Sequence, residues 1–465
     1  MAWVTQSINL NYTGQSVLAF LSNRQHKLVA QINTANSQLG NFEALILAAV
    51  ATDVSNHDRD GKQLQAKQSI SDAIKAAERE RRFTATSLQP CSVILLRTEN
   101  GELTSHHQHD MSSYERFRSL LKRQHGFFAQ DESNENSTPS NQLLPFEDIV
   151  YREPLASWRM TSSKVAIAAS PDDLKVYKGF TLYHFLVHGV QRSRSEIAAC
   201  YREIEMVNRI ISAHPHIIPP AHRLVYASTL ERANETPVRL ICGSLYNWYA
   251  KGSLADLLDR SVQDGQRFPP GLKARWCLQL CRAMHHVHHV ARNWHQDLKP
   301  PNILLDDQLN VVVIDWEQCG ANPFVLAPEA DGTLDVRQSD EETIARPRLV
   351  YERYAGPERM NQAVMPYWNV FPAWNKEFPL ACELAEVYSL GRTMWVILEQ
   401  VGLERQHGVT DYSTQSIRWT QQTSDIPMSW KSTVSACMAD DPNTRPLMSE
   451  LMTFWSEQAK WFSFD

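Results

Sequence analysis

The most informative part of the sequence is His295-Gln296-Asp297-Leu298-Lys299-Pro300-Pro301-Asn302-Ile303-Leu304-Leu305, followed after a short polar segment by Val311-Val312-Val313-Ile314-Asp315-Trp316-Glu317. Two apolar runs separated by the polar turn residues 306–308 predict a β-hairpin. The hairpin would hold four polar side chains at one rim, those of Asp297, Lys299, Asn302 and Asp315. Two carboxylates, an amide and an ammonium suit phosphoryl transfer, because cations neutralise the transferred group while a carboxylate orients the attacking hydroxyl.

These residues resemble the catalytic loop of eukaryotic protein kinases, H-R-D-L-K-P-x-N, and the metal-binding D-F-G motif that follows it. Every fixed position of the loop except the arginine is kept, and the spacing from Asp297 to Asn302 is that of the motif. The resemblance implies that Asp297 is the catalytic base and that Lys299 contacts the γ-phosphate of ATP. It also implies that Asn302 and Asp315 hold Mg²⁺.

Three structural residues are implied by the same resemblance. His295 opens the catalytic loop, and Trp316 keeps the apolar ring of the second motif. The segment Glu386-Val387-Tyr388-Ser389-Leu390-Gly391 resembles the D-V-Y-S-L-G start of a central buried helix, with Glu386 in place of the aspartate.

Two later segments are expected to meet in a buried ion pair. Ala355-Gly356-Pro357-Glu358 resembles the A-P-E motif that closes the kinase activation segment, and the segment 441–446 resembles a late arginine motif. The resemblance implies that Glu358 pairs with Arg445, a contact that adds little net stability but is costly to break. The activation segment would then be long, running from Asp315 to Glu358.

The ATP-binding residues are expected in the preceding part of the chain. Residues 249–254 resemble the exit of the hinge that grips adenine, which implies a hinge formed by Tyr246, Asn247, Trp248 and Tyr249. Lys178 ends an apolar strand and is assigned as the phosphate-binding lysine. Its ion-pair partner would be Glu203, on a helix expected over 193–211 with a capping box at Ser193 and Glu196. Two alternatives remain, namely Glu205 as the partner, and residues 165–168 as a V-A-I-K motif that has lost its lysine.

Three departures from the kinase pattern affect the functional interpretation. Between Gly126 and Gly179 there is no glycine, so the glycine-rich loop over the phosphates is absent and backbone N–H groups approach them less closely. Gln296 replaces the arginine that couples to an activation-loop phosphate, so phosphorylation there need not be the switch. Glu317 replaces the glycine after the metal-binding aspartate and removes a flexible position.

The rest of the chain indicates a soluble globular protein. Hydrophobic residues make up 43% and charged residues 21% of 465 residues, and the net charge of −6 does not favour binding to nucleic acid or to a membrane surface. Residues 1–130 are expected to be an α/β region of unknown function, with a strand over 91–96 that enters an Asn-Gly turn. The polar segment 131–145 is expected to be a linker. No secretory or membrane-spanning segment is recognisable, which predicts a cytoplasmic or nuclear protein.

The sequence therefore predicts an α+β chain with a two-lobed, protein-kinase-like domain over 146–465. Its β-rich N-lobe would cover 146–250 and its larger helical C-lobe 251–465. Lys299, two residues after Asp297, favours a serine/threonine kinase that uses ATP and Mg²⁺ on a protein substrate, similar to divergent kinase-like proteins of filamentous fungi. A pseudokinase and a small-molecule phosphotransferase are the alternatives, and the oligomeric state stays open.

Overall fold

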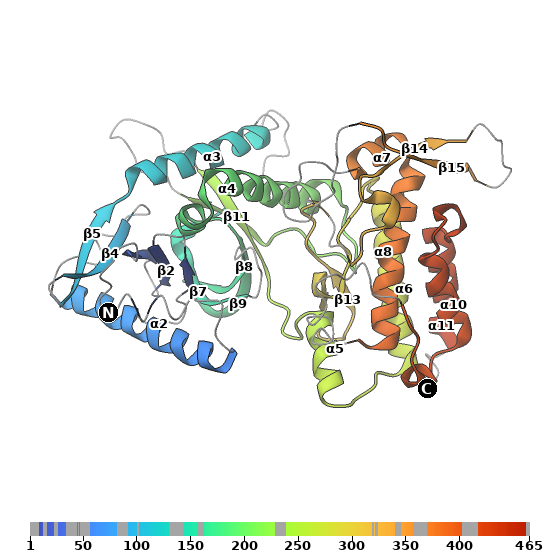
Figure 1. Cartoon of the computed structure of the whole chain (residues 1–465), viewed down its shortest axis with the longest axis horizontal. Coiled ribbons are helices and arrows are strands. Elements are labelled where there is room, and N and C mark those ends of the chain that lie inside the picture. Colours follow the sequence, from blue (N-terminus) through green and yellow to red (C-terminus); the bar gives the residue numbers. More distant parts are fainter. Residues whose placement is uncertain are drawn as a thin grey trace. The chain divides into compact units, whose positions relative to one another are not determined.

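The computed structural model describes residues 9–12, 16–22, 27–33, 44, 46, 56–80, 92–99, 102–129, 143–155, 162–227, 239–318, 320, 324–339, 346–356, 370–401 and 417–461. The chain is of mixed α/β composition, and its elements are labelled in Figure 1. Contacts divide it into two compact units. The first unit consists of Met1–Tyr201 and Ala221–Trp248, and the second of Arg202–Pro220 and Tyr249–Asp465.

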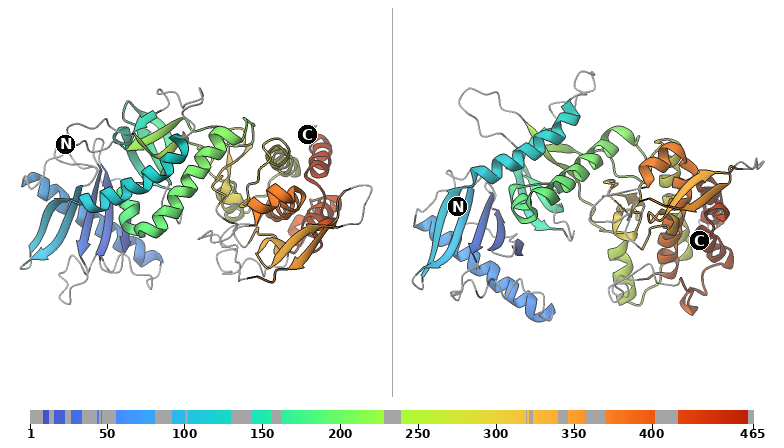
Figure 2. Two further views of the ribbon diagram at one scale, coloured as in Figure 1. Left: turned by 90° about the horizontal axis from the view of Figure 1, so that it is seen from above. Right: turned by 45° about the horizontal axis from the view of Figure 1, so that its top comes forward.

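The first unit begins with a five-stranded sheet of order β1-β2-β3-β4-β5. Its strands are β1 Asn9–Tyr12, β2 Ser16–Ser22, β3 Lys27–Asn33, β4 Ser92–Glu99 and β5 Glu102–His109. Helix α2 (Asn56–Arg79) lies between the parallel strands β3 and β4 in sequence and against the sheet, as Figure 2 shows. The β4–β5 pair, with Glu99 opposite Glu102, confirms the predicted strand, and the predicted Asn-Gly turn lies outside the described residues. Helix α3 (Met111–Ala129) follows, and its Phe117 ring lies 6.0 Å from that of Phe185.

A second sheet of the first unit has the order β6-β10-β11-β9-β8-β7. Its strands are β6 Leu143–Pro145, β7 Ile149–Pro154, β8 Ser162–Ile167, β9 Ser170–Gly179, β10 Arg223–Ala227 and β11 Leu240–Asn247. The sequence predicts a hairpin over 164–178 with a turn at residues 170–173. Strands β8 and β9 form this hairpin, but residues 171–173 form a bulge in β9 rather than the turn, because Ile167 pairs with Ser170 and Ala166 with Leu174. The pairing places Lys178 opposite Ser244 of β11.

Two glycines next to Lys178 allow β9 and β11 to approach closely. Gly179 lies opposite Gly243, and a Cβ atom on Gly179 would be 2.4 Å from the carbonyl oxygen of Cys242. A Cβ atom on Gly243 would be 2.6 Å from the ring of Tyr177. Because neither position carries a side chain, the buried ring of Tyr177 has room beside the two glycines.

The helix predicted over 193–211 begins earlier than expected. Helix α4 spans Leu182–Glu205, with a break at Gly189 (φ 70°), and a π-helical turn follows at Met206–Ile210. The predicted capping box is wrong, because Ser193 lies inside the helix and its Oγ has no hydrogen-bond partner within the described part of the chain. Its supposed partner Glu196 instead binds the Nδ1 of His188 at 2.5 Å. The left-handed glycine, rather than a serine cap, precedes the second half of the helix.

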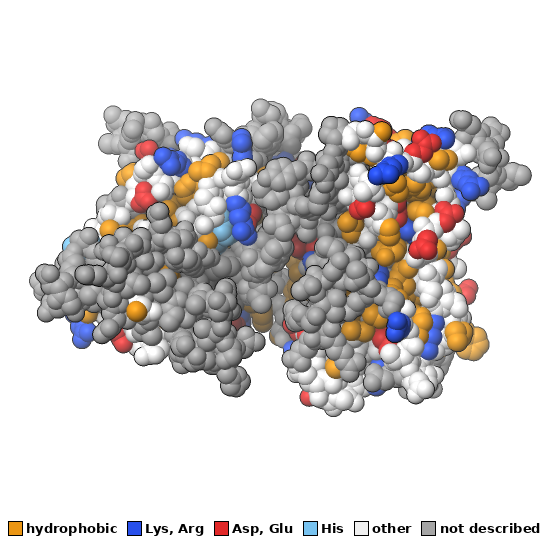
Figure 3. Space-filling model, in the orientation of Figure 1, with side chains coloured by type: hydrophobic (Ala, Val, Ile, Leu, Met, Phe, Trp, Pro, Cys, Tyr) orange, Lys and Arg blue, Asp and Glu red, His pale blue; other side chains and the backbone are white. Residues whose placement is uncertain are grey.

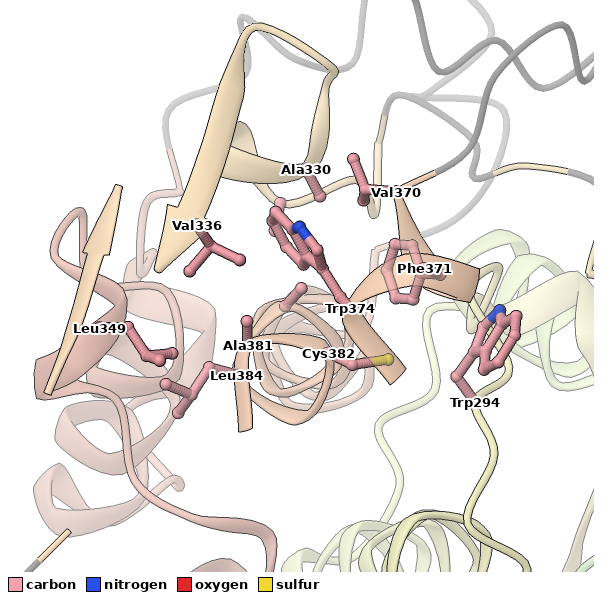
Figure 4. Packing of buried hydrophobic residues seen from close by; sticks show 12 residues of the cluster. Trp294, Ala330, Val336, Leu349, Val370, Phe371, Trp374, Ala381, Cys382 and Leu384 are labelled. Atoms are coloured by element: carbon pink, nitrogen blue, oxygen red, sulfur yellow. The ribbon is translucent and has the colours of Figure 1, made fainter. Parts of the chain in front are cut away.

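The second unit is mainly helical. Its elements are α5 Leu254–Gln263, α6 Pro270–His289, β12 Ile303–Leu305, β13 Val311–Val313, β14 Leu334–Gln338, β15 Leu349–Arg353, α7 Phe371–Glu377, α8 Pro379–Glu399, α10 Met428–Cys437 and α11 Met448–Trp461. The sequence predicts helices at about 253–263, 271–292, 383–401 and 446–459, and these are found as α5, α6, α8 and α11. Helix α8 is buried along most of its length and packs against α6, α7 and α10 (Figure 1). Figure 4 shows Val336 of β14 and Trp374 of α7 in the apolar cluster on α8.

Two cations hold the carboxyl end of α8. The Nζ of Lys273 donates a hydrogen bond to the carbonyl oxygen of Leu398 at 3.0 Å, and Arg267 donates one to that of Glu399 at 2.9 Å. The side chain of Lys273 is fully buried. Burial, assisted by the nearby charge of Arg267, lowers the pKa of Lys273 to about 8.

This pKa predicts how Lys273 affects stability at alkaline pH. The unfolded lysine keeps its proton up to about pH 10.5, so between pH 8 and 10.5 the unfolded chain binds more protons and the contribution of Lys273 to stability rises with pH. Urea titrations should therefore show that, between pH 7 and pH 10, the free energy of unfolding of the wild type rises by about 2–3 kcal/mol relative to that of Lys273→Met. A difference that stays constant over this range would show that the lysine is not desolvated.

The surface gives two further observations. No helix in the described part of the chain is long and apolar enough to cross a membrane. On the face drawn in Figure 3, the coloured acidic and basic side chains are interspersed, as is usual for protein surfaces that meet water.

Candidate active site

The predicted hairpin brings the catalytic-loop segment and Asp315 to the same end of two strands. β12 and β13 are antiparallel, with Ile303 opposite Val313, so the residue before β12 is next to the residue after β13. The backbone N–H of Ile314 donates to the carbonyl oxygen of Asn302 at 2.9 Å. Asn302 and Asp315 are therefore neighbours at one rim, as the sequence predicted.

The side chains of the loop form a compact polar network. The carboxylate of Asp297 accepts hydrogen bonds from the Nζ of Lys299 at 2.5 Å and from the Nδ2 of Asn302 at 3.2 Å. Asn302 also donates to the backbone carbonyl oxygen of Asp297 at 2.9 Å. The side chains of Asp297 and Lys299 keep 18% and 21% of their surface exposed, so the carboxylate is partly accessible to solvent.

Glu386, a buried residue of α8, binds the backbone at the start of the loop 295–302. Glu386 of α8 accepts hydrogen bonds from the backbone N–H groups of His295 at 2.9 Å and Gln296 at 2.5 Å, while its other oxygen lies 2.5 Å from the Nε2 of His288. Gln296 has a left-handed φ of 79°, which costs energy in a residue other than glycine. The carboxylate of Glu386 therefore stabilises a strained turn immediately before Asp297.

The aromatic residues of the two motifs also meet. The Nε2 of His295 lies 2.8 Å from the carbonyl oxygen of Ile314, and the ring of His295 meets that of Trp316 at an edge, with 4.5 Å between centroids. Both side chains are fully buried. The contacts of His295 with Ile314 and Trp316 therefore link the start of the loop 295–302 to the segment that carries Asp315.

Three carboxylates gather beside this rim. Glu203, Asp315 and Glu317 each offer one oxygen, and the three oxygens lie within 4.8 Å of one another. Oxygen ligands of this kind suit a hard divalent cation such as Mg²⁺, which would also offset the repulsion between the charges. Glu317, considered in the sequence only as a lost glycine, is a candidate ligand that sequence reasoning missed.

Lys178 and Glu203 belong to different compact units. Lys178 lies on β9 of the first unit, and Glu203 lies in the last turn of α4, within the part that belongs to the second unit. Glu203 is buried, with 3% of its surface exposed. The ion pair between the two residues stays a prediction.

The predicted hinge residues lie at and after the end of β11. Tyr246 is buried, Asn247 accepts a hydrogen bond from the Nζ of Lys175 at 3.2 Å, and the Nζ of Lys164 lies 4.5 Å from the ring centre of Trp248. Tyr249 begins the second unit, and the pKa of its hydroxyl is raised by burial and by the charge of Asp306. Their role in binding adenine stays a prediction.

Arg445, which the sequence analysis pairs with Glu358, has Glu329 as its charged partner among the described residues. Its guanidinium donates to both carboxylate oxygens of Glu329, at 2.5 Å and 3.0 Å, and to the carbonyl oxygen of Leu384 at 3.0 Å. Arg445 is fully buried and Glu329 is 4% exposed. Glu358 itself lies outside the described residues.

This pairing draws attention to a second segment that resembles the A-P-E motif. Ala327-Pro328-Glu329 reproduces the A-P-E sequence in full, whereas the segment 355–358 matches it only with an inserted glycine. By the same resemblance, a segment that begins at Asp315 would end at Glu329 and would be much shorter than one that ends at Glu358. Strands β14 and β15 lie between this A-P-E sequence and α8 in the chain.

Comparisons with known proteins give partial matches. No protein-family model matches the chain. The chain is 26% identical over 209 residues, 43% of its length, to a protein of Acanthamoeba polyphaga mimivirus whose name describes it as a serine/threonine-protein kinase/receptor. It is 32% identical over 92 residues, 17% of its length, to the serine/threonine-protein kinase shk2 of Schizosaccharomyces pombe. The chain spans 11% and 14% of these two relatives, so the similarity to serine/threonine kinases is partial.

Proposed function

We propose that the protein is a Mg²⁺-dependent serine/threonine protein kinase that transfers the γ-phosphoryl group of ATP to a protein hydroxyl. The observation that carries the proposal is the contact of Asp297 with Lys299 and Asn302, at the same end of the hairpin as Asp315. The partial similarity to serine/threonine kinases supports it. The proposal includes a kinase-like domain over 146–465, with lobes 146–250 and 251–465, after the region 1–130 and the linker 131–145.

Each residue has a role in this reaction. The serine or threonine oxygen of the substrate attacks the γ-phosphorus of ATP and releases ADP, while the hydroxyl proton passes to the carboxylate of Asp297. Lys299 neutralises charge on the transferred group. Asn302 and Asp315 would hold Mg²⁺, with Glu317 and Glu203 as further oxygen donors, and the ion would neutralise charge on the phosphates. On the strength of the sequence resemblance, Lys178 and the hinge residues 246–249 are assigned to ATP.

The function is tested by incubating the pure full-length protein with Mg²⁺ and γ-labelled ATP, with and without generic protein substrates. Transfer of label to serine or threonine is the expected result. The absent glycine-rich loop favours a second candidate, a pseudokinase that binds nucleotide without turnover. ATP binding in the complete absence of transfer would support that alternative.

Mg²⁺ is expected to account for much of the ATP affinity. Without a glycine-rich loop, fewer backbone donors reach the phosphates, and one lost charge-assisted hydrogen bond costs roughly 1.5–3 kcal/mol. Asp315→Asn should therefore weaken ATP binding in Mg²⁺ by about ten-fold or more, and change binding in chelator only slightly. Calorimetric titration measures both values, with Asp335→Asn on the exposed face of β14 as the matched control. Tight ATP binding without Mg²⁺ would contradict this account.

A further inference from the structure

Gln318 connects three segments of the second unit. Its Oε1 accepts a hydrogen bond from the Nε of Arg202 at 2.9 Å, near the end of α4. Its Nε2 donates to the Oδ1 of Asn293 at 2.6 Å and to the carbonyl oxygen of Trp294 at 2.5 Å. Asn293 and Trp294 immediately precede His295, so one side chain joins α4, the start of the catalytic loop and the segment after Asp315.

The partners allow only one orientation of this amide. Arg202 can only donate, and the carbonyl oxygen of Trp294 can only accept, so the Oε1 must face the arginine and the Nε2 must face the loop. Both N–H donors of the amide are used. A glutamate would have the same shape and could still accept from Arg202, but it would place an oxygen against the carbonyl oxygen of Trp294.

The backbone at Gln318 also needs support. Its φ is 54°, a left-handed value that residues other than glycine rarely adopt. Asp315, three residues earlier, is left-handed as well, with a φ of 71°. The three hydrogen bonds of Gln318 hold the turn that follows Asp315 in this conformation.

We propose that Gln318 is a positioning residue that fixes Asp315 and Asp297 relative to each other without a phosphate group. The inference rests on the proposed kinase function and concerns how its site is kept in order. Gln296, at the position of the arginine that would bind an activation-loop phosphate, is neutral and fully buried, and its backbone N–H is bound to Glu386. The Arg202–Gln318 contact also fixes the residue next to Glu203, a member of the carboxylate cluster.

The test uses Gln318→Glu, which removes the two donated hydrogen bonds and keeps the shape of the side chain. Because small misplacements of reacting groups are costly, kcat should fall by about 10- to 100-fold while the KM for ATP changes much less. Gln338→Glu, a change of the same charge on the exposed end of β14, should leave both constants unchanged. Phosphatase treatment of the wild type should not lower its activity.

Hydrogen exchange provides a measurement that does not depend on turnover. The backbone amides of 294–297 and 315–318 should exchange faster in Gln318→Glu, with the rest of the described chain unchanged. Wild-type exchange and wild-type kcat in the variant would overturn the proposal, as would loss of wild-type activity on dephosphorylation. If the wild type transfers no phosphoryl group, the kinase function fails, and the exchange rates alone decide whether Gln318 holds the two loops.

Discussion

Asp297→Asn is expected to lower kcat for phosphoryl transfer by roughly 10²- to 10⁴-fold, the contribution typical of a general base. The amide cannot take the hydroxyl proton, and Lys299 loses its 2.5 Å contact with a charged partner. Nucleotide binding should change little, because Asn302 keeps its 2.9 Å hydrogen bond to the backbone of residue 297. Steady-state kinetics and calorimetric ATP titration measure the two effects separately.

The matched control for this substitution is Asp307→Asn, in the exposed turn of the same hairpin. It removes the same charge close by in sequence without touching the polar network, so its kcat should equal that of the wild type. Equal rates for wild type and Asp297→Asn would remove Asp297 from the role of base.

Glu329→Ala is expected to lower the free energy of unfolding by about 3–5 kcal/mol, because it leaves the buried guanidinium of Arg445 without its charged partner. Urea denaturation followed by circular dichroism measures the loss. Glu329→Gln should cost less, since the amide oxygen still accepts one hydrogen bond from Arg445.

Glu358→Ala distinguishes the two assignments of the ion pair. Among the described residues Glu329 already binds both terminal guanidinium nitrogens of Arg445, so Glu358→Ala should cost much less than Glu329→Ala. A large loss of stability with Glu358→Ala and a small one with Glu329→Ala would restore the pairing predicted from sequence.

The parts of the fold that the sequence predicted correctly are those set by local patterns. The apolar runs Ile303–Leu305 and Val311–Val313 on either side of a polar turn form β12 and β13, and the strand before Asn100-Gly101 forms a hairpin with the next. In both cases the alternation of apolar and turn residues is contained within about twenty residues. The rim that carries Asn302 and Asp315 follows directly from such a hairpin.

Sequence reasoning was wrong or ambiguous where several local patterns compete. Ser193 and Glu196 have the spacing of a capping box, but the left-handed Gly189 already interrupts the helix and leaves Ser193 inside it. Two segments resemble A-P-E, and the choice between them depends on which carboxylate is buried with Arg445. Burial is a property of the folded chain, so the spacing in the sequence could not decide.

The residues that sequence reasoning missed depend on contacts between distant segments. Glu317 becomes a candidate metal ligand only because folding brings Glu203 of α4 beside Asp315. Gln318 has no motif of its own, and its contacts reach back to Arg202 and to Asn293. A single sequence carries no signal for pairs of this kind, whereas Asp297, Lys299, Asn302 and Asp315 are singled out by their resemblance to kinase motifs.

The central claim is that this site transfers phosphoryl groups to protein hydroxyls. Its most direct test is to follow ADP release and phosphoprotein formation together in the pure wild-type protein with ATP and Mg²⁺, and to map the modified residues by mass spectrometry. The account predicts that ADP and phosphoserine or phosphothreonine form mole for mole, that chelation of Mg²⁺ stops both, and that Asp297→Asn forms neither at a comparable rate. Bound ATP that yields no phosphorylated residue, or transfer that continues undiminished in Asp297→Asn, would contradict it.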